Sequence, residues 1–338
     1  MKEYGSFFST VEKDLAIETK KWINNFDYKI HYTGRQALLF ILDNINLINN
    51  IENIYLPKFY CKDVYVFIKN FNDKFMFYEP KNLSDIKFNK NDVLLLNPLF
   101  GIYSNDLLNN QGDKPITIED HTHSWSSENC INSTANYCFA SLRKTYPIPL
   151  GAVTWSKNNT FNELKDQDNS ATLEYVEIWN LIKKAQDLKR EYLLGVKVDK
   201  DQYLKKISYA EKELNQEVLT SADVLEEHKD IILKWMACNL LKAKKKNTSS
   251  LLKLIALKNQ DFVVLNTKET TGFGLILEFI NEEKMNRFKT YIIRNNIFPA
   301  NLWPENEHMK KKYLLIHTDF RYNAEDMNYI AKRLNEYV

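Results

Sequence analysis

The stretch YCFASLRKTYPIPLG, residues 137–151, decides how the rest of the chain is interpreted. Its first five residues, 137–141, are typical of a buried strand, and a short loop carrying Lys144 follows. Pro147 and Pro149 exclude a helix there and restrict the backbone of the loop. A single lysine in such a place is most often a solvated surface charge. The serine and arginine just before Lys144 are good phosphate donors and favour a binding site instead.

Similar short apolar runs surround this stretch in the first half of the chain, at residues 54–57, 74–80, 92–98, 116–120 and 152–155. Several end in Pro, Asp or Ser, as strands buried on both faces of a parallel sheet do. Helical stretches separate the runs, so the spacing predicts an α/β core with a mainly parallel sheet.

The second half of the chain has a different character. Leu, Lys, Glu and Ala at helical spacing fill about residues 172–255, with almost no Gly or Pro. Alternating strand and helix patterns follow, at 262–266, 273–280, 282–296, 313–320 and 323–337. We therefore expect a large α/β domain with connecting helices over residues 1–215 and a small C-terminal α+β domain over residues 216–338.

The composition describes a globular chain of 338 residues, 44% apolar and 13% aromatic, which excludes both a disordered protein and a small disulfide-stapled fold. The 46 basic and 44 acidic side chains leave a net charge of +2. Binding to nucleic acid or an anionic membrane draws on excess positive charge, so neither partner is expected. The lysine run at 242–246 is interpreted as the solvated end of a helix, where cations suit the macrodipole, rather than as a nucleic-acid patch.

The cysteines and the N-terminus indicate the compartment. The four cysteines lack the C-x-x-C spacing of a zinc site and the density of a secreted scaffold; they are Cys61, Cys130, Cys138 and Cys238. The N-terminus has no apolar signal region, and no run approaches the roughly 20 apolar residues of a membrane span. We expect a soluble cytoplasmic protein with reduced thiols.

Two further constellations precede the lysine loop. Thr33-Gly34-Arg35-Gln36 stands before a helical run, and the N–H groups of a first helical turn can bind phosphate, although an ordinary glycine turn has the same sequence. Ile118-Glu119-Asp120-His121-Thr122-His123 lies at a strand end, where open α/β sheets bind their ligands. A carboxylate there can keep a heterocyclic nitrogen protonated. Strand alternation directs Glu119 and Asp120 to opposite sides, so no shared metal ion is expected.

Taken in their order along the chain, these motifs resemble those of the DegT/DnrJ/EryC1/StrS family of pyridoxal-phosphate sugar aminotransferases. The resemblance runs from about residue 30 to the C-terminus. The most specific segment is FASLRKTYPIPLGA, which is similar to the branch with a short S-L-R-K-x-x-P-x-P-x-G lysine loop. Other similar segments are TGRQALLFIL, LPKFYCKDVYVFI, IEDHTHSW, NNIFPANLWP and IHTDFRYNAEDMNYIAKRL. The resemblance implies an aspartate-aminotransferase-like fold, pyridoxal 5′-phosphate as cofactor, and a homodimer.

The resemblance also implies roles for single residues. Lys144 would bind the cofactor covalently as a Schiff base and move the proton of the reaction, and Asp120 would pair with the pyridine nitrogen. His123 would contact the phenolic oxygen or the ring face. Either Tyr60 or Cys61 would cover the ring, because Cys61 stands where many members have an aromatic residue.

The phosphate and the substrate would be bound by other residues. Backbone N–H groups of Gly34, Arg35 and Gln36, with the Ser141 hydroxyl, would hold the phosphate. In the small domain Trp303 and Arg321 would contact the substrate, the first without the histidine that often precedes it. Arg321 could bind a carboxylate bidentately, or equally form a structural ion pair.

The expected activity is transfer of an amino group from a donor such as glutamate to a keto acceptor, most plausibly a nucleotide-linked keto-sugar for a surface glycan or natural product. One alternative is a pyridoxal-phosphate enzyme acting on an amino acid or another small carbonyl compound. Another is a non-catalytic binding or regulatory descendant, suggested by the altered phosphate turn. A nucleotide-binding Rossmann protein is disfavoured because no G-x-G-x-x-G or G-x-x-x-x-G-K-[ST] follows any candidate strand.

Overall fold

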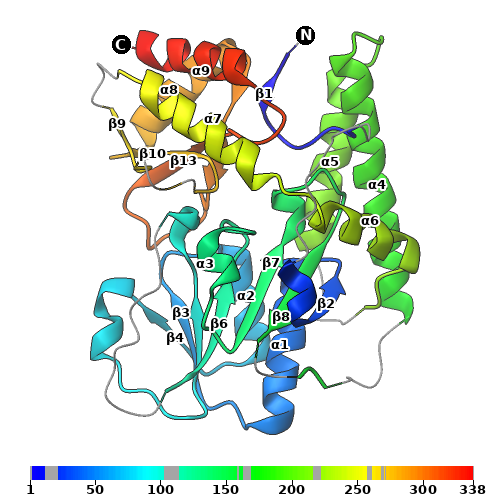
Figure 1. Ribbon diagram of the computed structural model, residues 1–338, viewed down its shortest axis with the longest axis vertical. Coiled ribbons are helices and arrows are strands. Elements are labelled where there is room, and N and C mark those ends of the chain that lie inside the picture. The colour runs from blue at the N-terminus through cyan, green and yellow to red at the C-terminus, as the bar shows by residue number, and fades with distance from the viewer. Residues whose placement is uncertain are drawn as a thin grey trace. The chain divides into compact units, whose positions relative to one another are not determined.

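The computed structural model describes residues 2–11, 22–102, 114–157, 160–162, 169–215, 222–256, 261–267, 270 and 272–337. The chain divides into two compact units (Figure 1): a large unit of residues 8–97 and 105–238, and a small unit of residues 1–7, 98–104 and 239–338. The expected boundary between residues 215 and 216 adjoins the segment 216–221, which lies outside the described residues, so it stays a prediction.

The large unit is built on a seven-stranded sheet. In spatial order its strands are β2 (Asp27–His31), β8 (Ala152–Ser156), β7 (Tyr137–Ser141), β6 (Ile116–Asp120), β5 (Val93–Leu96), β3 (Ile54–Pro57) and β4 (Phe75–Tyr78). Strand β8 is antiparallel to both of its neighbours, and all other neighbouring pairs are parallel. The expected α/β fold with a mainly parallel sheet is confirmed.

The central strands form where the apolar runs predicted them. Every residue of β3 and β5 is buried, which is why both read as continuous apolar runs. Strand β2 was not predicted, because DYKIH at the sheet edge is only partly buried and lacks such a run.

Helices connect and flank these strands. Helix α1 (Gly34–Ile48) packs on β7 and β8, and the Thr33 side chain caps it by accepting a hydrogen bond from the Gln36 N–H. Helices α4 (Asn169–Leu193) and α5 (Lys200–Asn215) pack side by side, as Figure 1 shows. The remaining helices of the large unit are α2 (Lys62–Phe71), α3 (Glu128–Ile131) and α6 (Glu226–Met236). Among the described helices, none has the length and apolar character needed to cross a membrane.

The small unit contains an antiparallel four-stranded sheet in the order β12 (Ala300–Leu302), β13 (Lys312–Ile316), β10 (Leu275–Phe279) and β9 (Phe262–Val264). Its helices are α7 (Leu241–Leu254), α8 (Glu282–Arg294) and α9 (Ala324–Glu336). Phe279, Phe288 and Met327 lie at the centre of its core. This is the small α+β unit that the strand and helix patterns predicted.

The N-terminus belongs to the small unit, which local patterns did not predict. Strand β1 (Tyr4–Gly5) pairs in parallel with β11 (Ile297–Phe298). Gly5 has a φ of +108°, and a Cβ there would lie 2.0 Å from the Phe298 carbonyl oxygen. Only glycine can therefore occupy this position without moving the backbone.

The interpretation of the lysine run as a helix end is wrong. The run occupies the first half of α7, which begins at Leu241, and Lys244 is only 8% exposed. The break between α6 and α7 falls at residues 237–240, which contain neither Gly nor Pro, so the sequence shows no boundary there.

Candidate active site

The topology of the large unit brings three of the predicted motifs to one edge of the sheet. Strands β6 and β7 are parallel neighbours with Asp120 opposite Phe139, so their carboxyl ends lie side by side. Strand β2 runs in the same direction as β7, because both are antiparallel to β8. Asp120, Ser141 and the start of α1 therefore share the edge at which open α/β sheets bind ligands.

Asp120 is buried and held by hydrogen bonds on both carboxylate oxygens. The Tyr60 hydroxyl donates to Oδ2 at 2.5 Å, and the Thr122 N–H donates to Oδ1 at 2.8 Å. Thr122 Oγ1 in turn accepts a 3.0 Å hydrogen bond from the Ser141 N–H, which ties the end of β6 to the end of β7. Burial raises the pKa of Asp120, and the hydrogen bonds from Thr122 and Tyr60 act in the opposite direction.

Tyr60 and Cys61, the two residues predicted to pack against the cofactor ring, have different surroundings. Tyr60 is 2% exposed and directed to Asp120. Cys61 is half-buried and precedes α2, and although burial raises the pKa of its thiol, the nearby charge of Lys144 lowers it. Tyr60 therefore contacts Asp120 directly, whereas Cys61 is close enough to Lys144 for the lysine charge to act on its thiol. Which of them covers a bound ring stays a prediction.

The start of α1 approaches the end of β7 closely. A Cβ at Gly34 would lie 3.3 Å from Cβ of Ser141 and 3.9 Å from its hydroxyl oxygen, so glycine keeps this space open. The N–H of Gln36 already donates to Thr33 Oγ1, and its side-chain oxygen accepts from the Tyr32 N–H. Of the predicted phosphate donors, Gln36 is therefore engaged within the turn itself, whereas Gly34 and Ser141 face each other across it.

Lys144 ends a short helical turn, Leu142–Lys144, whose start is hydrogen-bonded to Gly151. The N–H groups of Leu142 and Arg143 both donate to the Gly151 carbonyl, at 2.8 and 3.4 Å. These bonds join the start of the Lys144 loop to its end at Gly151, in agreement with the prediction of a constrained loop. The side chain of Lys144 is exposed to water.

Two charged side chains near Lys144 shift its pKa in opposite directions. The Arg143 guanidinium lowers the pKa of Lys144 most, the protein atoms around the lysine act in the same direction, and Glu211 raises it. Arg143 forms a bidentate ion pair with Glu211, with N···O distances of 2.6 and 3.0 Å. Burial raises the pKa of Glu211, but the charges of Arg143 and Lys144 outweigh it and lower the pKa to about 2.

Helix α5 thus supplies residues to the site that sequence reasoning missed. Glu211 lies 68 residues from Arg143, and no motif or spacing connects them. The Arg35 guanidinium also reaches α5, donating a hydrogen bond to the Leu214 carbonyl.

The other predicted site residues are placed as follows. His123 is half-buried in the turn after β6, three residues beyond Asp120. Trp303 and Arg321 belong to the small unit. The Trp303 ring lies 5.0 Å from that of Phe100, and the residue has a φ of +47°. Their roles in binding stay predictions.

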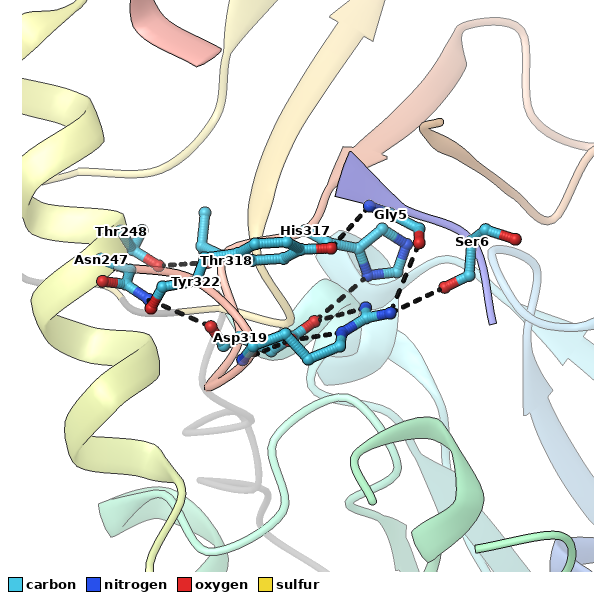
Figure 2. Close-up of polar contacts among 9 residues, drawn as sticks. Gly5, Ser6, Asn247, Thr248, His317, Thr318, Asp319 and Tyr322 are labelled. Carbon is cyan, nitrogen blue, oxygen red and sulfur yellow. Dashed lines mark hydrogen bonds and ion pairs between the residues drawn. The ribbon is translucent and has the colours of Figure 1, made fainter. Parts of the chain in front are cut away.

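Gly5, Ser6 and Asp319 belong to a polar cluster of the small unit (Figure 2), and Arg321 contacts all three. Its Nε and Nη2 atoms bind the two carboxylate oxygens of Asp319, each at 2.8 Å, and Nη1 donates to the carbonyls of Gly5 and Ser6 at 3.4 and 3.3 Å. The Arg321 charge holds the pKa of Asp319 far below its usual range despite burial. This arrangement is the structural ion pair named above as the alternative to carboxylate binding.

Comparison with known proteins connects this arrangement to a fold. No family model and no curated protein matches the sequence. Solved structures do match. A candidate sugar aminotransferase of Streptococcus pneumoniae, in its PLP form, has a TM-score of 0.58 at 10% identity, over 98% of this chain and 92% of that one. The chain therefore shares the fold of this PLP-bound structure.

Other matches share the fold but carry out different reactions. The GDP-4-keto-6-deoxy-D-mannose-3-dehydratase of E. coli, with hydrated PLP, has a TM-score of 0.57 at 11% identity and covers 98% of this chain and 100% of that chain. A serine palmitoyltransferase of S. paucimobilis has a TM-score of 0.50 at 10% identity, over 93% and 73% of the two chains. The expected aminotransferase-like fold is confirmed, and the reaction must be argued from this chain's own residues.

Proposed function

We propose that this protein is a pyridoxal-phosphate-dependent aminotransferase that passes an amino group from an amino acid such as glutamate to a nucleotide-linked keto-sugar. The observation that carries the proposal is the meeting, at one sheet edge, of the buried Asp120 carboxylate, the Ser141 hydroxyl beside Gly34, and the Lys144 loop that is closed by hydrogen bonds to Gly151. The sugar acceptor rests on the sequence resemblance and is supported by the sugar-modifying enzymes among the structural neighbours.

The residues fit the cofactor. An aromatic nitrogen needs an acid, and Asp120 keeps further lone pairs on both oxygens beyond those that Tyr60 and Thr122 use. A phosphate needs N–H groups and a hydroxyl, and the space between Gly34 and Ser141 would be narrowed by any larger residue at position 34. The carbonyl of the cofactor needs a lysine, which Lys144 supplies from a restrained loop.

When bound, the cofactor withdraws electrons from the carbon next to the transferred nitrogen. In the proposed reaction Asp120 would hold the proton on the pyridine nitrogen, which the negative charge of its carboxylate favours. Lys144, with a pKa below its usual value, more readily exists as the neutral amine that accepts a proton at Nζ. Arg143 stays paired with Glu211 and keeps this lysine beside a positive charge. We further propose a cytoplasmic homodimer.

Covalent labelling tests the cofactor site. Wild-type protein incubated with pyridoxal phosphate and then reduced with borohydride should carry a pyridoxyl group on Lys144 in a peptide map. Lys144→Ala should lose the label, and Lys157→Ala, which removes an exposed lysine of the same unit, should keep it. A pyridoxyl group on another lysine of the wild type would contradict the assignment.

The reaction itself is tested in two halves. Glutamate alone should convert the bound cofactor to its amine form, measured after release by chromatography, because amino transfer completes its first half without an acceptor. A nucleotide-linked 4-keto-sugar should then regenerate the carbonyl form. Regeneration by small keto acids only would favour the alternative substrate class, and a cofactor on Lys144 that no amino acid converts would favour the non-catalytic descendant. Asp120→Asn should slow the first half by several orders of magnitude, each tenfold being about 1.4 kcal/mol.

A further inference from the structure

A second group of chemically reactive side chains lies on the opposite side of strand β6 from Asp120. Glu119 and Cys138 are register partners on β6 and β7, and His121 follows Glu119 by two residues, so it returns to the same side. One ligand atom from each of the three residues can be chosen so that all lie within 4.8 Å of one another. All three side chains are buried, and His121 is 0% exposed.

One buried polar atom of this cluster has no hydrogen-bond partner among the described residues. His121 Nε2 is a buried polar atom that makes no hydrogen bond to any residue the structure describes, although Glu119 Oε2 lies 3.1 Å away. A buried nitrogen without a hydrogen-bond partner destabilises the folded protein. A metal ion satisfies both atoms together, because two ligands each about 2.0 Å from a tetrahedral ion are roughly 3.3 Å apart.

The residues around the cluster are those that support metal ligands. Ser124 Oγ lies 2.8 Å from His121 Nδ1, which orients the ring so that Nε2 points to Glu119. Ser133 donates a 2.5 Å hydrogen bond to Glu119 Oε2, and its oxygen lies 3.3 Å from Cys138 Sγ. Such partners on the far nitrogen of a histidine and on a carboxylate are the usual supports of a metal site.

The donor set indicates which metal. Imidazole nitrogen, thiolate sulfur and carboxylate oxygen together suit Zn²⁺, whereas Mg²⁺ and Ca²⁺ prefer oxygen alone. A zinc ion with one thiolate, one carboxylate and a neutral imidazole is uncharged, which a buried site tolerates best.

We infer that Glu119, His121 and Cys138 form a structural zinc site. On binding, Cys138 loses its thiol proton to solvent and its sulfur coordinates the ion. The site would fasten β6 to β7 directly behind Asp120, and would do so whether or not the proposed aminotransferase activity is correct.

The test uses the full-length protein without added pyridoxal phosphate. Wild type dialysed against zinc and then against metal-free buffer should retain about one zinc per chain by elemental analysis. Replacement by Co²⁺ should give the visible bands of a tetrahedral ion and a near-ultraviolet sulfur-to-cobalt band. Removing the metal with a chelator should lower the melting temperature, and zinc should restore it.

Variants assign the ligands. Cys138→Ala should abolish the sulfur-to-cobalt band and weaken zinc binding by about 100-fold or more, and Glu119→Gln, which keeps the size of the side chain, should also weaken it strongly. Cys238→Ala removes a cysteine outside the cluster and should bind zinc like the wild type. The inference is overturned if the wild type retains no zinc and shows no cobalt bands, or if soluble Cys138→Ala binds zinc as tightly as the wild type. The wild-type cobalt spectrum decides the matter even if a variant fails to fold.

Discussion

The Tyr60 hydroxyl donates a 2.5 Å hydrogen bond to Oδ2 of Asp120, a residue 60 positions further along the chain. Both side chains are buried, so water cannot replace the bond when it is removed. A hydrogen bond to a charged group contributes about 1.5–3 kcal/mol, compared with about 0.5–1.5 kcal/mol for one between neutral groups. The bond therefore contributes to folding as well as to the position of Asp120.

Tyr60→Phe should lower the free energy of unfolding at neutral pH by about 1.5–3 kcal/mol, measured by urea denaturation. Tyr78→Phe is the matched control, because the Tyr78 hydroxyl donates to a neutral acceptor, the Leu95 carbonyl, at 2.8 Å. It should cost less than Tyr60→Phe. Equal losses in the two variants would show that the contact with Asp120 has no special strength.

Arg143 lowers the pKa of Lys144 and Glu211 raises it. Replacing each by a neutral residue should therefore shift the titration midpoint of Lys144 in opposite directions. Glu211→Gln removes a charge that raises the pKa of Lys144 and should lower its midpoint. Arg143→Gln removes the charge that lowers it and should raise the midpoint. Acetylation of Lys144 at increasing pH, followed by peptide mass spectrometry, measures both, with the exposed Lys69 as internal reference. Shifts of the same sign would refute this account of the ion pair.

Arg321→Lys distinguishes a structural arginine from one that binds substrate. Lysine cannot reproduce the bidentate pair with Asp319 and the contacts with Gly5 and Ser6, so the free energy of unfolding should fall by about 1–3 kcal/mol. Arg294→Lys, at an exposed position of the same unit, should have little effect. Unchanged stability with weakened glutamate binding would instead support the substrate role.

Lys244 gives the protein a pH-dependent stability. Burial lowers its pKa from 10.5 to about 8, although Asp319 acts in the opposite direction. Between these two values the unfolded chain binds the proton and the folded chain does not, so stability rises with pH. The free energy of unfolding of the wild type, relative to that of Lys244→Met, should therefore rise by on the order of 3 kcal/mol between a pH below 8 and a pH above 10.5.

The control for this measurement is Lys245→Met, because Lys245 is exposed on the same helix. Its difference from the wild type should stay nearly constant over the same pH range. If the difference in free energy of unfolding between the wild type and Lys244→Met were also constant, Lys244 would be solvated and its pKa would not be lowered by burial.

Local sequence predicted the parts of this fold that depend on local chemistry. Strand β6 lies at 116–120 and β7 at 137–141, as their short apolar runs indicated. The start of α1 after Thr33 and the closed loop before Gly151 also follow from residues within one or two turns of each other. Alternation along β6 correctly separated Glu119 from Asp120, which bind different partners.

What the sequence by itself determined about this protein is the set of strands and turns and the order of the motifs, because apolar runs, caps and prolines act over a few residues. Only the tertiary structure decided that Tyr60 meets Asp120, that Glu211 pairs with Arg143, and that Gly5 joins the small unit. These pairs are separated by tens to hundreds of residues. Their contacts depend on how whole strands and helices pack, and no local propensity encodes that packing.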